Sequence, residues 1–549
     1  KVELEEHPDA AGLITARNFG GTAKWRTSYV SDGTGHSMLY TVSDQAIAAS
    51  IPVHERMEAL SLIHDGARCF GAIARNLMTG ELVAYNAHAT CIATGGFGRI
   101  YQVSTNAIIN QGMGAALALE TGFAELGNME AVQFHPTAIF PAGILVTEGC
   151  RGDGGLLLDK NEHRFMPDYE PEKAELASRD VVSRHMESHI RKGLGVQSRF
   201  GEHLWLDIRL LGEEHINTKL REVKEICQYF LGIDPARELI PVRPAQHYSM
   251  GGIRTDAHGH SSTLPGLFAC GEAACWDLHG FNRLGGNSVA ETVVAGMIVG
   301  EAMADFCTAA GGASSFDTVL VRSRFNREQA ALEALRNNSG SHSVAELNAA
   351  MQATMTRHVG IYRDAAGLAQ AVEELTDLLQ RCKDVKLTSG AGGADPELVL
   401  AYRLPRMLKL ALCVAEGALN RTESRGAHCR VDFPERDDNQ WLNRTLASWP
   451  EGTSGPQLRY EALDIMTMEL PPAWRGYGSR DFIAHPRQAE RQREVDTLAQ
   501  QHTNRFERQH ALMPYTHLLP EQYRARNARF LEDDAGNVAE RHPTKGAAT

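Results

Sequence analysis

The residues of this chain that could bind an anion or move a proton stand where patterned segments of the sequence meet. They are His135, Thr147, Glu148, Arg151, Arg179, His247 and Arg283. Two imidazoles, a hydroxyl and a guanidinium suffice to hold both carboxylates of a small dicarboxylic acid, because arginine can form two parallel hydrogen bonds to one carboxylate. Taken singly, each histidine is better explained as a hydrogen-bonded structural residue and each arginine as an ion-paired one. Spacing alone does not bring these side chains together.

The segment "VTEGCRGDGG", residues 146–155, places Glu148 and Arg151 three residues apart among four glycines. Glycine disfavours helix strongly, so the composition predicts a turn and not a stable helix. The simplest interpretation is a surface turn with a local ion pair, which contributes little to stability.

A second group of residues is typical of a nucleotide site. The apolar run "TCIATGG" stops on Gly95 and Gly96, where the backbone can approach a ligand closely, and Glu272 follows the apolar run "GLFACG". Asn287 and Ser288 follow two glycines and begin a helical pattern, so free amides and a positive dipole end face an anion there. A loop carboxylate and an ordinary capped core helix explain these features one by one. Their accumulation predicts a dinucleotide.

Composition excludes some partners. The chain has 549 residues and a net charge of −13, which argues against nucleic acid, since phosphate binding needs a basic face. None of its ten cysteines forms a C-x-x-C pair, so we expect reduced thiols and neither a zinc site nor an iron–sulfur cluster in this chain. The longest apolar run, "VVAGMIVGEAMADF", is interrupted by Glu301 and Asp305 and is predicted to be too short to cross a bilayer. Because the chain opens at Lys1 without a targeting segment, we expect its front to be missing.

The composition and the residue patterns of the sequence change along the chain. Residues 60–94 alternate short apolar runs with tight turns, which predicts a β-meander leading into a buried strand. Residues 160–240 are rich in charged residues and show helical patterns, and from about residue 245 the sequence is again rich in glycine and apolar residues. Residues 315–432 are helical in pattern, whereas 433–549 are rich in Arg, Pro and aromatic residues. The economical interpretation is a domain interrupted by an inserted lobe, with a ligand cleft between the two.

Several long strings then point to one family. They are "FGGTAKWRT", "ATGGFGRIY", "GNMEAVQFHPT", "TEGCRGDGG", "ELASRDVVSR", "QHYSMGGIRTD", "GEAACWDLHGFNRLGGNS" and "NRTESRGAHCR". Together they resemble the flavoprotein subunit of quinol:fumarate reductase and of succinate dehydrogenase. The resemblance runs from about residue 11 to the Arg-rich end, which is essentially the whole chain.

The resemblance implies a multidomain fold of the α/β and α+β classes. A Rossmann-like FAD-binding domain would comprise residues 1–137 and 245–314, interrupted by a capping domain over 138–244. A helical domain over 315–432 and a C-terminal domain over 433–549 would follow. In the family a glycine-rich fingerprint and a histidine joined covalently to FAD precede the point that matches Lys1. Neither is in this sequence, so no attachment residue is assigned.

The resemblance also implies roles for individual residues. A dicarboxylate would be held by His135, Thr147, His247 and Arg283, with Phe19 against it near the flavin. Arg179 would donate the proton and be resupplied through Glu148 and Arg151. The FAD contacts would be Thr94, Gly95, Gly96, Glu272, Asn287 and Ser288.

The activity implied is interconversion of fumarate and succinate, with an iron–sulfur subunit and a membrane cytochrome b subunit that binds quinone as partners. The chain would then lie peripherally on the cytoplasmic face of the inner membrane. The direction of the reaction depends on the quinone potential, so succinate oxidation is an alternative. A flavoprotein similar to L-aspartate oxidase is another. A non-catalytic interaction module fits less well with the complete set of site residues.

Overall fold

The computed structural model describes residues 16–17, 19–22, 27–309, 317–388, 394–463 and 488–502, with isolated positions up to 511. The chain divides into two compact units, one of residues 1–3, 15–435 and 445–460, and one of residues 4–14, 436–444 and 461–549. All residues of the candidate site belong to the first unit.

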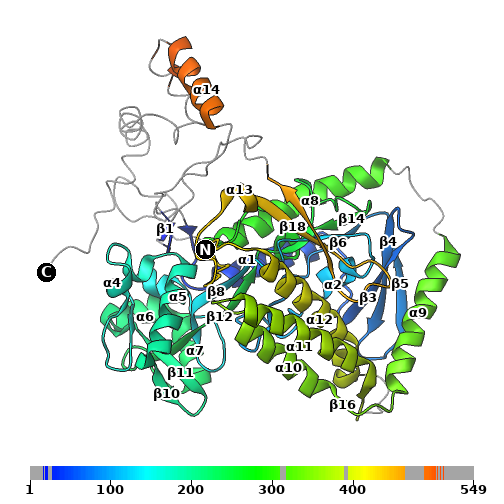
Figure 1. The fold of residues 1–549 in the computed structure, drawn as a ribbon, viewed down its shortest axis with the longest axis horizontal. Helices are drawn as coiled ribbons and strands as arrows, with labels where there is room; N and C mark the ends of the chain where they lie inside the picture. Colours follow the sequence, from blue (N-terminus) through cyan, green and yellow to red (C-terminus); the bar gives the residue numbers. More distant parts are fainter. Residues whose placement is uncertain are drawn as a thin grey trace. The chain divides into compact units, whose positions relative to one another are not determined.

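The predicted β-meander is confirmed. It consists of β3 (Met57–His64), β4 (Cys69–Asn76) and β5 (Leu82–Asn86), which pair antiparallel in that order (Figure 1). The turns after β3 and β4 contain Gly66 and Gly80 at φ of 91° and 80°, a region that glycine adopts at little cost. The strand that follows is β6 (Thr90–Ile92), in which Ile92 is buried and the other two residues are half-buried, and it pairs parallel with β14 (Leu267–Ala269). Parallel strands bring their carboxyl ends to one edge, so the residues after β6 and β14 meet there.

A second sheet belongs to a lobe with its own core. Its strand order is β10-β11-β12-β8, with β9 paired to β11. The strands are β8 (Val132–Ile139), β9 (Leu156–Leu158), β10 (Val196–Ser198), β11 (Gly201–Asp207) and β12 (Ile240–Ser249). The helices are α4 (Met166–Tyr169), α5 (Arg179–His189), α6 (Glu213–Lys219) and α7 (Arg221–Leu231). A separate apolar cluster drawn from residues 139–242, including Leu157, Val182 and Leu204, holds this lobe together.

The glycine-rich segment 146–155 differs from the prediction. Gly149–Gly152 form a single helical turn, α3, in which Gly149, Cys150 and Arg151 are buried. The expectation of a non-helical surface turn was therefore wrong. Glycine's low helix propensity is a weak preference, and tertiary contacts to a buried turn override it.

The largest core joins a third sheet to a group of helices. The sheet order is β15-β13-β7-β18-β19, from β7 (Leu126–Gly127), β13 (Gly252–Arg254), β15 (Ala274–Cys275), β18 (Asn443–Ser448) and β19 (Gln457–Ala462). The helices are α2 (Met113–Leu119), α9 (Thr318–Arg336), α10 (Val344–His358), α11 (Ala365–Arg381) and α12 (Pro396–Asn420), which confirms the helical pattern of residues 315–432. The side chains of Asp364 and Asp395 cap α11 and α12 by accepting bonds from the amides of Gly367 and Leu398. Two short strands, β16 (His342–Ser343) and β17 (Val385–Lys386), pair parallel; in the sequence β16 precedes α10 and β17 follows α11.

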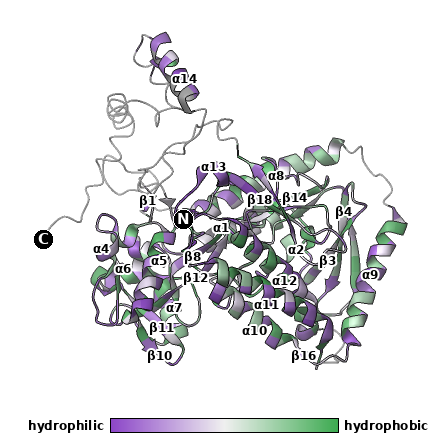
Figure 2. Ribbon diagram, viewed as in Figure 1, coloured by the Kyte–Doolittle hydropathy of each residue, from purple (hydrophilic) through white to green (hydrophobic). Residues whose placement is uncertain are grey.

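Two helices of the first unit carry apolar residues that are not buried. In α1 (Thr34–Ala48) none of the residues is buried, and α8 (Asn287–Ala309) exposes most of its apolar side chains, which are green in Figure 2. The apolar run predicted to be too short is part of this longer helix, which starts at Asn287. By length and composition α8 could cross a membrane, so that expectation was wrong, although one such helix is weak evidence for a span.

The remaining elements are a two-stranded ribbon and two helices of the described residues. A two-stranded ribbon, β1 (Ala16–Arg17) with β2 (Thr27–Ser28), belongs to the first unit. The second unit contains α13 (Asp438–Trp441) and α14 (Gln488–Gln501), and Asp437 caps α13. Much of the predicted C-terminal domain, including residues 464–487 and 512–549, lies outside the described residues.

Candidate active site between β8, β12 and α5

Two predicted site histidines face each other on paired strands. His135 lies on β8 opposite Ala245 of β12, and the register shifts between Gln246 and Tyr248, so that His247 occupies a β-bulge. A bulge re-aims the side chain of its extra residue. The two imidazole centroids are 4.9 Å apart, with the rings edge to face. The bulge thus places both histidines at one site, as their predicted common role requires.

The two imidazoles are neutral in this arrangement. Burial lowers the pKa of His135 well below its ordinary value, and the neighbouring Arg179 and His247 lower it further. Burial, followed by Arg179 and Arg283, likewise lowers the pKa of His247. The His135 Nδ1 accepts a bond from the amide of Thr137 at 3.2 Å, which leaves its Nε2 to carry the proton. His135 can therefore donate one hydrogen bond from Nε2.

Arg283 is a buried cation without a carboxylate partner among the contacts that the structure shows for it. Its side chain lies over the ring of Tyr248 at 4.4 Å, and it donates to His247 Nε2 at 3.0 Å and to the carbonyl of Leu284 at 3.2 Å. Its Nε makes no hydrogen bond within the described residues. Burial, and then repulsion from Arg179, lower its pKa to about 9. Such a guanidinium is stabilised by any anion that enters the site.

Glu148 ties together the segments that carry the proposed proton path. Its Oε2 accepts bonds from the Nε and NH2 of Arg179 at 2.9 and 2.7 Å, and its Oε1 accepts one from the amide of Gly20 at 2.9 Å. The NH2 of Arg151 lies 3.6 Å from the same Oε1. The side chains of Arg151 and Glu148 are 0% and 1% exposed, so bulk water does not compete for these bonds.

The charges of this trio support one another. Burial raises the pKa of Glu148, but the charges of Arg179 and Arg151 and the hydrogen bonds from Arg179 and Gly20 outweigh it, so the pKa lies below its ordinary value. Burial lowers the pKa of Arg151, and Glu148 only partly opposes that effect. The NH1 of Arg151 donates to the carbonyl of Glu175, while its Nε and NH2 form no hydrogen bond within the described part of the chain. Glu148 is therefore an anion with two cations at hand, one closely bonded and one at ion-pair distance.

The other two predicted substrate contacts lie close to this trio. Thr147 precedes Glu148, and its hydroxyl accepts a bond from the amide of Gly149 at 3.2 Å, which leaves the hydroxyl proton free to donate. A Cβ built on Gly285 would lie 3.1 Å from the ring of Phe19, so Phe19 packs against the glycines that follow Arg283. The hydrogen bond from the amide of Gly20 to Glu148 holds Phe19 and its neighbours at the site.

Gln133 is a site residue that the sequence argument missed. It is fully buried, its Nε2 donates to the carbonyl of Arg283 at 2.7 Å, and its Oε1 accepts a bond from the NH1 of Arg179 at 3.4 Å. It stands two residues before His135, so the period of two along a strand puts both on the same face of β8. The spacing of two residues from His135 is the feature of the sequence from which Gln133 could have been predicted as a site residue.

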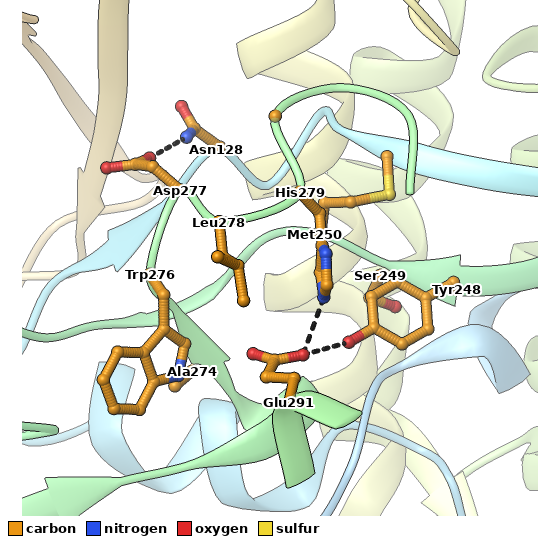
Figure 3. Close-up of a pocket in the computed structure, with 11 residues that line it drawn as sticks. Asn128, Tyr248, Ser249, Met250, Ala274, Trp276, Asp277, Leu278, His279 and Glu291 are labelled. Carbon is orange, nitrogen blue, oxygen red and sulfur yellow. Dashed lines mark hydrogen bonds and ion pairs between the residues drawn. The ribbon is translucent and has the colours of Figure 1, made fainter. Parts of the chain in front are cut away.

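Tyr248 and Glu291, which the sequence did not identify as site residues, support the side chain of Arg283. Figure 3 shows Glu291 accepting bonds from the hydroxyl of Tyr248 at 2.9 Å and from the Nε2 of His279 at 2.7 Å, in a small pocket. Glu291 is the fifth residue of α8, and the ring of Tyr248 lies under Arg283. The carboxylate thereby fixes the aromatic ring that supports the guanidinium.

The predicted cofactor residues divide between two places. At the strand ends Gly95 has φ of 72°, and a Cβ built on Gly96 would collide with the carboxylate of Glu272 and the hydroxyl of Ser249. Glu272 accepts a bond from the amide of Ser249 at 2.9 Å, and burial raises its pKa to about 7. Thr94 instead lies against Gly114 at the start of α2.

The second place is the start of α8. Asn287 is its first residue and Ser288 its second, and Gly286 before them has φ of 79°. A Cβ built on Gly285 would lie 2.8 Å from the Glu148 carboxylate, so this loop passes close to that carboxylate. Bare backbone at both places, with a helix N-terminus and a buried carboxyl, fits an extended flavin dinucleotide.

Taken together, the site holds more positive than negative side chains. Of Arg151, Arg179 and Arg283, the first two lie at hydrogen-bond or ion-pair distance from the Glu148 carboxylate, and two neutral imidazoles lie beside them. Such a site attracts a small dianion and can donate several hydrogen bonds to it.

Comparison with known proteins identifies the class and then the family. Residues 3–289 match the FAD binding domain model and residues 348–477 match the fumarate reductase flavoprotein C-terminal model, so the chain is an FAD-binding flavoprotein. The fumarate reductase flavoprotein subunit of Helicobacter pylori is 49% identical over 566 residues, covering 97% of this chain and 78% of the relative. The succinate dehydrogenase flavoprotein subunit of Rickettsia bellii is 36% identical, covering 85% and 81%. The structure of a variant of the E. coli quinol fumarate reductase FrdA superposes with a TM-score of 0.80 at 36% identity, covering 86% of this chain and 82% of that one.

This chain therefore belongs to the fumarate reductase and succinate dehydrogenase flavoprotein subunit family. The resemblance drawn from the sequence strings is confirmed, as are the multidomain fold class and FAD as the cofactor.

Proposed function

We propose that this chain interconverts fumarate and succinate at the site between β8, β12 and α5. The observation that carries the proposal is the buried arrangement of Arg179 on Glu148 beside two neutral histidines and the buried cation Arg283. A dianion entering this site meets uncompensated positive charge, and a proton donor stands next to it.

The chain's own residues suit the two tasks of binding and protonation. Arg283 would bind one carboxylate through two parallel bonds, exchanging its present bond to His247 for the ligand. His135 and Thr147 each have a donor available for the other carboxylate. FAD, when bound, supplies the hydride, and Glu272, Asn287, Ser288 and the glycines at 95 and 96 would hold it. Holding the alkene between the flavin and Arg179 is catalysis by positioning.

Protonation of the second alkene carbon would come from Arg179. An arginine is ordinarily a permanent cation, so its proton must be replaced as it leaves. Glu148 bonds to two nitrogens of Arg179 and lies 3.6 Å from Arg151, which suits a relay from Arg151 through Glu148 to Arg179. Fumarate then gains one hydride and one proton, which balances as succinate.

The family names of the relatives support further proposals about organisation. The relatives are named flavoprotein subunits, and one matched structure is of a quinol fumarate reductase, so we infer an iron–sulfur subunit and a membrane cytochrome b subunit that binds quinone as partners. The chain would then be peripheral to the cytoplasmic face of the inner membrane. A separate apolar core drawn from residues between 139 and 242 supports the proposal of a capping domain over 138–244.

The test is an anaerobic titration of the flavin-loaded complex. After reduction, fumarate should reoxidise the flavin with one succinate formed per flavin, and succinate should bleach the oxidised flavin. L-Aspartate should do neither. Bleaching by L-aspartate without a response to succinate would refute the proposal in favour of an amino-acid oxidase.

A further inference from the structure

Helix α5 presents the proposed proton donor at its first residue and a different set of polar groups toward its end. Arg179 begins the helix and bonds to Glu148, while Arg184 and Ser188 lie roughly one and a half and two and a half turns further on. Because a helix is stiff over three turns, whatever holds its second half also sets the position of its first residue. Figure 1 shows α5 beside β8 and β12.

The second half of α5 is held by a tyrosine from a distant part of the chain. The hydroxyl of Tyr362 donates to the carbonyl of Arg184 at 3.0 Å, so its oxygen is left to accept the bond from the Ser188 hydroxyl at 2.6 Å. The guanidinium of Arg191 lies 5.0 Å from the centre of the same ring. One phenol therefore engages the backbone, a hydroxyl and a cation of the α5 segment.

Tyr362 is itself fixed by its neighbour in sequence. Arg363 is 1% exposed, and its NH1 donates to the carbonyl of Glu130 at 2.9 Å and to His428 Nδ1 at 2.8 Å. Its backbone amide donates to the carbonyl of Cys429 at 3.0 Å. The phenol thus projects from a buried anchor between α10 and α11 that is bonded through its NH1 and its backbone amide, and it has little freedom to follow a displaced helix.

We propose that Tyr362 is a positioning residue for proton transfer: it holds α5 so that Arg179 meets the bound dicarboxylate in the right place. This inference rests on the proposed function. A second contact, from Arg184 NH1 to the carbonyl of Gly426 at 2.9 Å, joins α5 to the same region and does not depend on the phenol. Loss of the Tyr362 hydroxyl therefore loosens α5 without detaching it.

The test compares Tyr362→Phe, Ser188→Ala and the double variant in the flavin-loaded complex. We expect kcat for fumarate reduction to fall roughly tenfold in Tyr362→Phe, as for one or two neutral hydrogen bonds that align a reacting group. The solvent deuterium isotope effect on kcat should rise, because proton transfer becomes more rate-limiting. The dissociation constant of malonate should stay within about twofold, because the proposed ligand contacts lie off α5. The double variant should lose no more than Tyr362→Phe alone, since both remove one shared contact.

The matched control is Tyr85→Phe, which removes an exposed 2.6 Å bond between the hydroxyl of Tyr85 on β5 and His54. It should leave all three readouts unchanged. Unchanged kcat and isotope effect in Tyr362→Phe, with an active wild type, would overturn the inference and leave the proposed function standing. A parallel loss of malonate affinity would also overturn it, since that would mean a general collapse of the site. A wild type that does not reduce fumarate would refute the proposed function, and the inference with it.

Discussion

Replacing Arg179 by glutamine is the most informative single change at the site. All three nitrogen positions of its guanidinium are engaged, with Nε and NH2 on Glu148 and NH1 on Gln133. Glutamine is shorter and uncharged, so the variant loses the proton donor. Glu148 keeps the amide of Gly20 at 2.9 Å and Arg151 at 3.6 Å, so its carboxylate remains partly compensated.

The two consequences differ in size. A positioned acid contributes roughly 10²- to 10⁴-fold to a rate, which is about 2.7–5.4 kcal/mol of barrier. The lost charge-assisted hydrogen bonds should cost roughly 1.5–3 kcal/mol of stability. We therefore expect kcat for fumarate reduction to fall by at least about a hundredfold, while the variant still folds and binds flavin.

The assay follows oxidation of a reduced low-potential dye by fumarate, with flavin content and melting temperature measured on the same samples. The control is Arg164→Gln, which removes a bidentate arginine pair with Glu175 at 3.0 and 2.6 Å in the same lobe. The Arg164 side chain is 45% exposed but that of Glu175 is only 4% exposed, so this change should also cost stability, whereas activity should not change because Arg164 has no proposed role in the reaction. Activity of Arg179→Gln within about fivefold of wild type would refute its role as proton donor.

Three further outcomes are expected. Gly96→Ala should lower the flavin content of the purified protein, measured as the absorbance ratio at 450 and 280 nm, because its Cβ would collide with the Glu272 carboxylate; full flavin content would contradict that contact. Dicarboxylate binding should take up protons and weaken as pH rises, because a bound dianion raises the depressed pKa of both site histidines. Calorimetry in buffers of different ionisation enthalpy measures the proton uptake. Binding without proton uptake would exclude the two histidines as groups that respond to the bound dianion. Arg421→Met should destabilise the first unit by roughly 3–5 kcal/mol in denaturant unfolding, because it leaves the fully buried Glu130 without its cation; a loss below about 1 kcal/mol would show that water or another group compensates.

Much of the fold could be predicted because local pattern and tertiary structure agree. The alternation in residues 60–94 and the turn glycines are sufficient for the meander, and the apolar spacing is sufficient for α5 and α7. The helical turn α3 could not be predicted, because contacts far away in sequence stabilise it against the preference of its glycines.

The residues of the site could be named from their types and from the family resemblance, but their convergence could not be derived from spacing. His247 reaches His135 only because β12 contains a bulge, and no residue pattern marks its position. Gln133 and Glu291 act through backbone and aromatic contacts that appear only once the strands and α8 are placed. The sequence does not show which partner a single polar residue in an apolar strand will contact.

The central claim is that Arg179 delivers a proton to a dicarboxylate held on the flavin. A crystal structure of the flavin-loaded complex with a bound dicarboxylate tests it most directly. The account predicts a terminal nitrogen of Arg179 within about 3.5 Å of a central carbon of the ligand, on the side opposite the flavin, with Glu148 still bonded to it. A ligand whose carbons lie beyond the reach of Arg179 while the lobe is closed over the site would contradict the account.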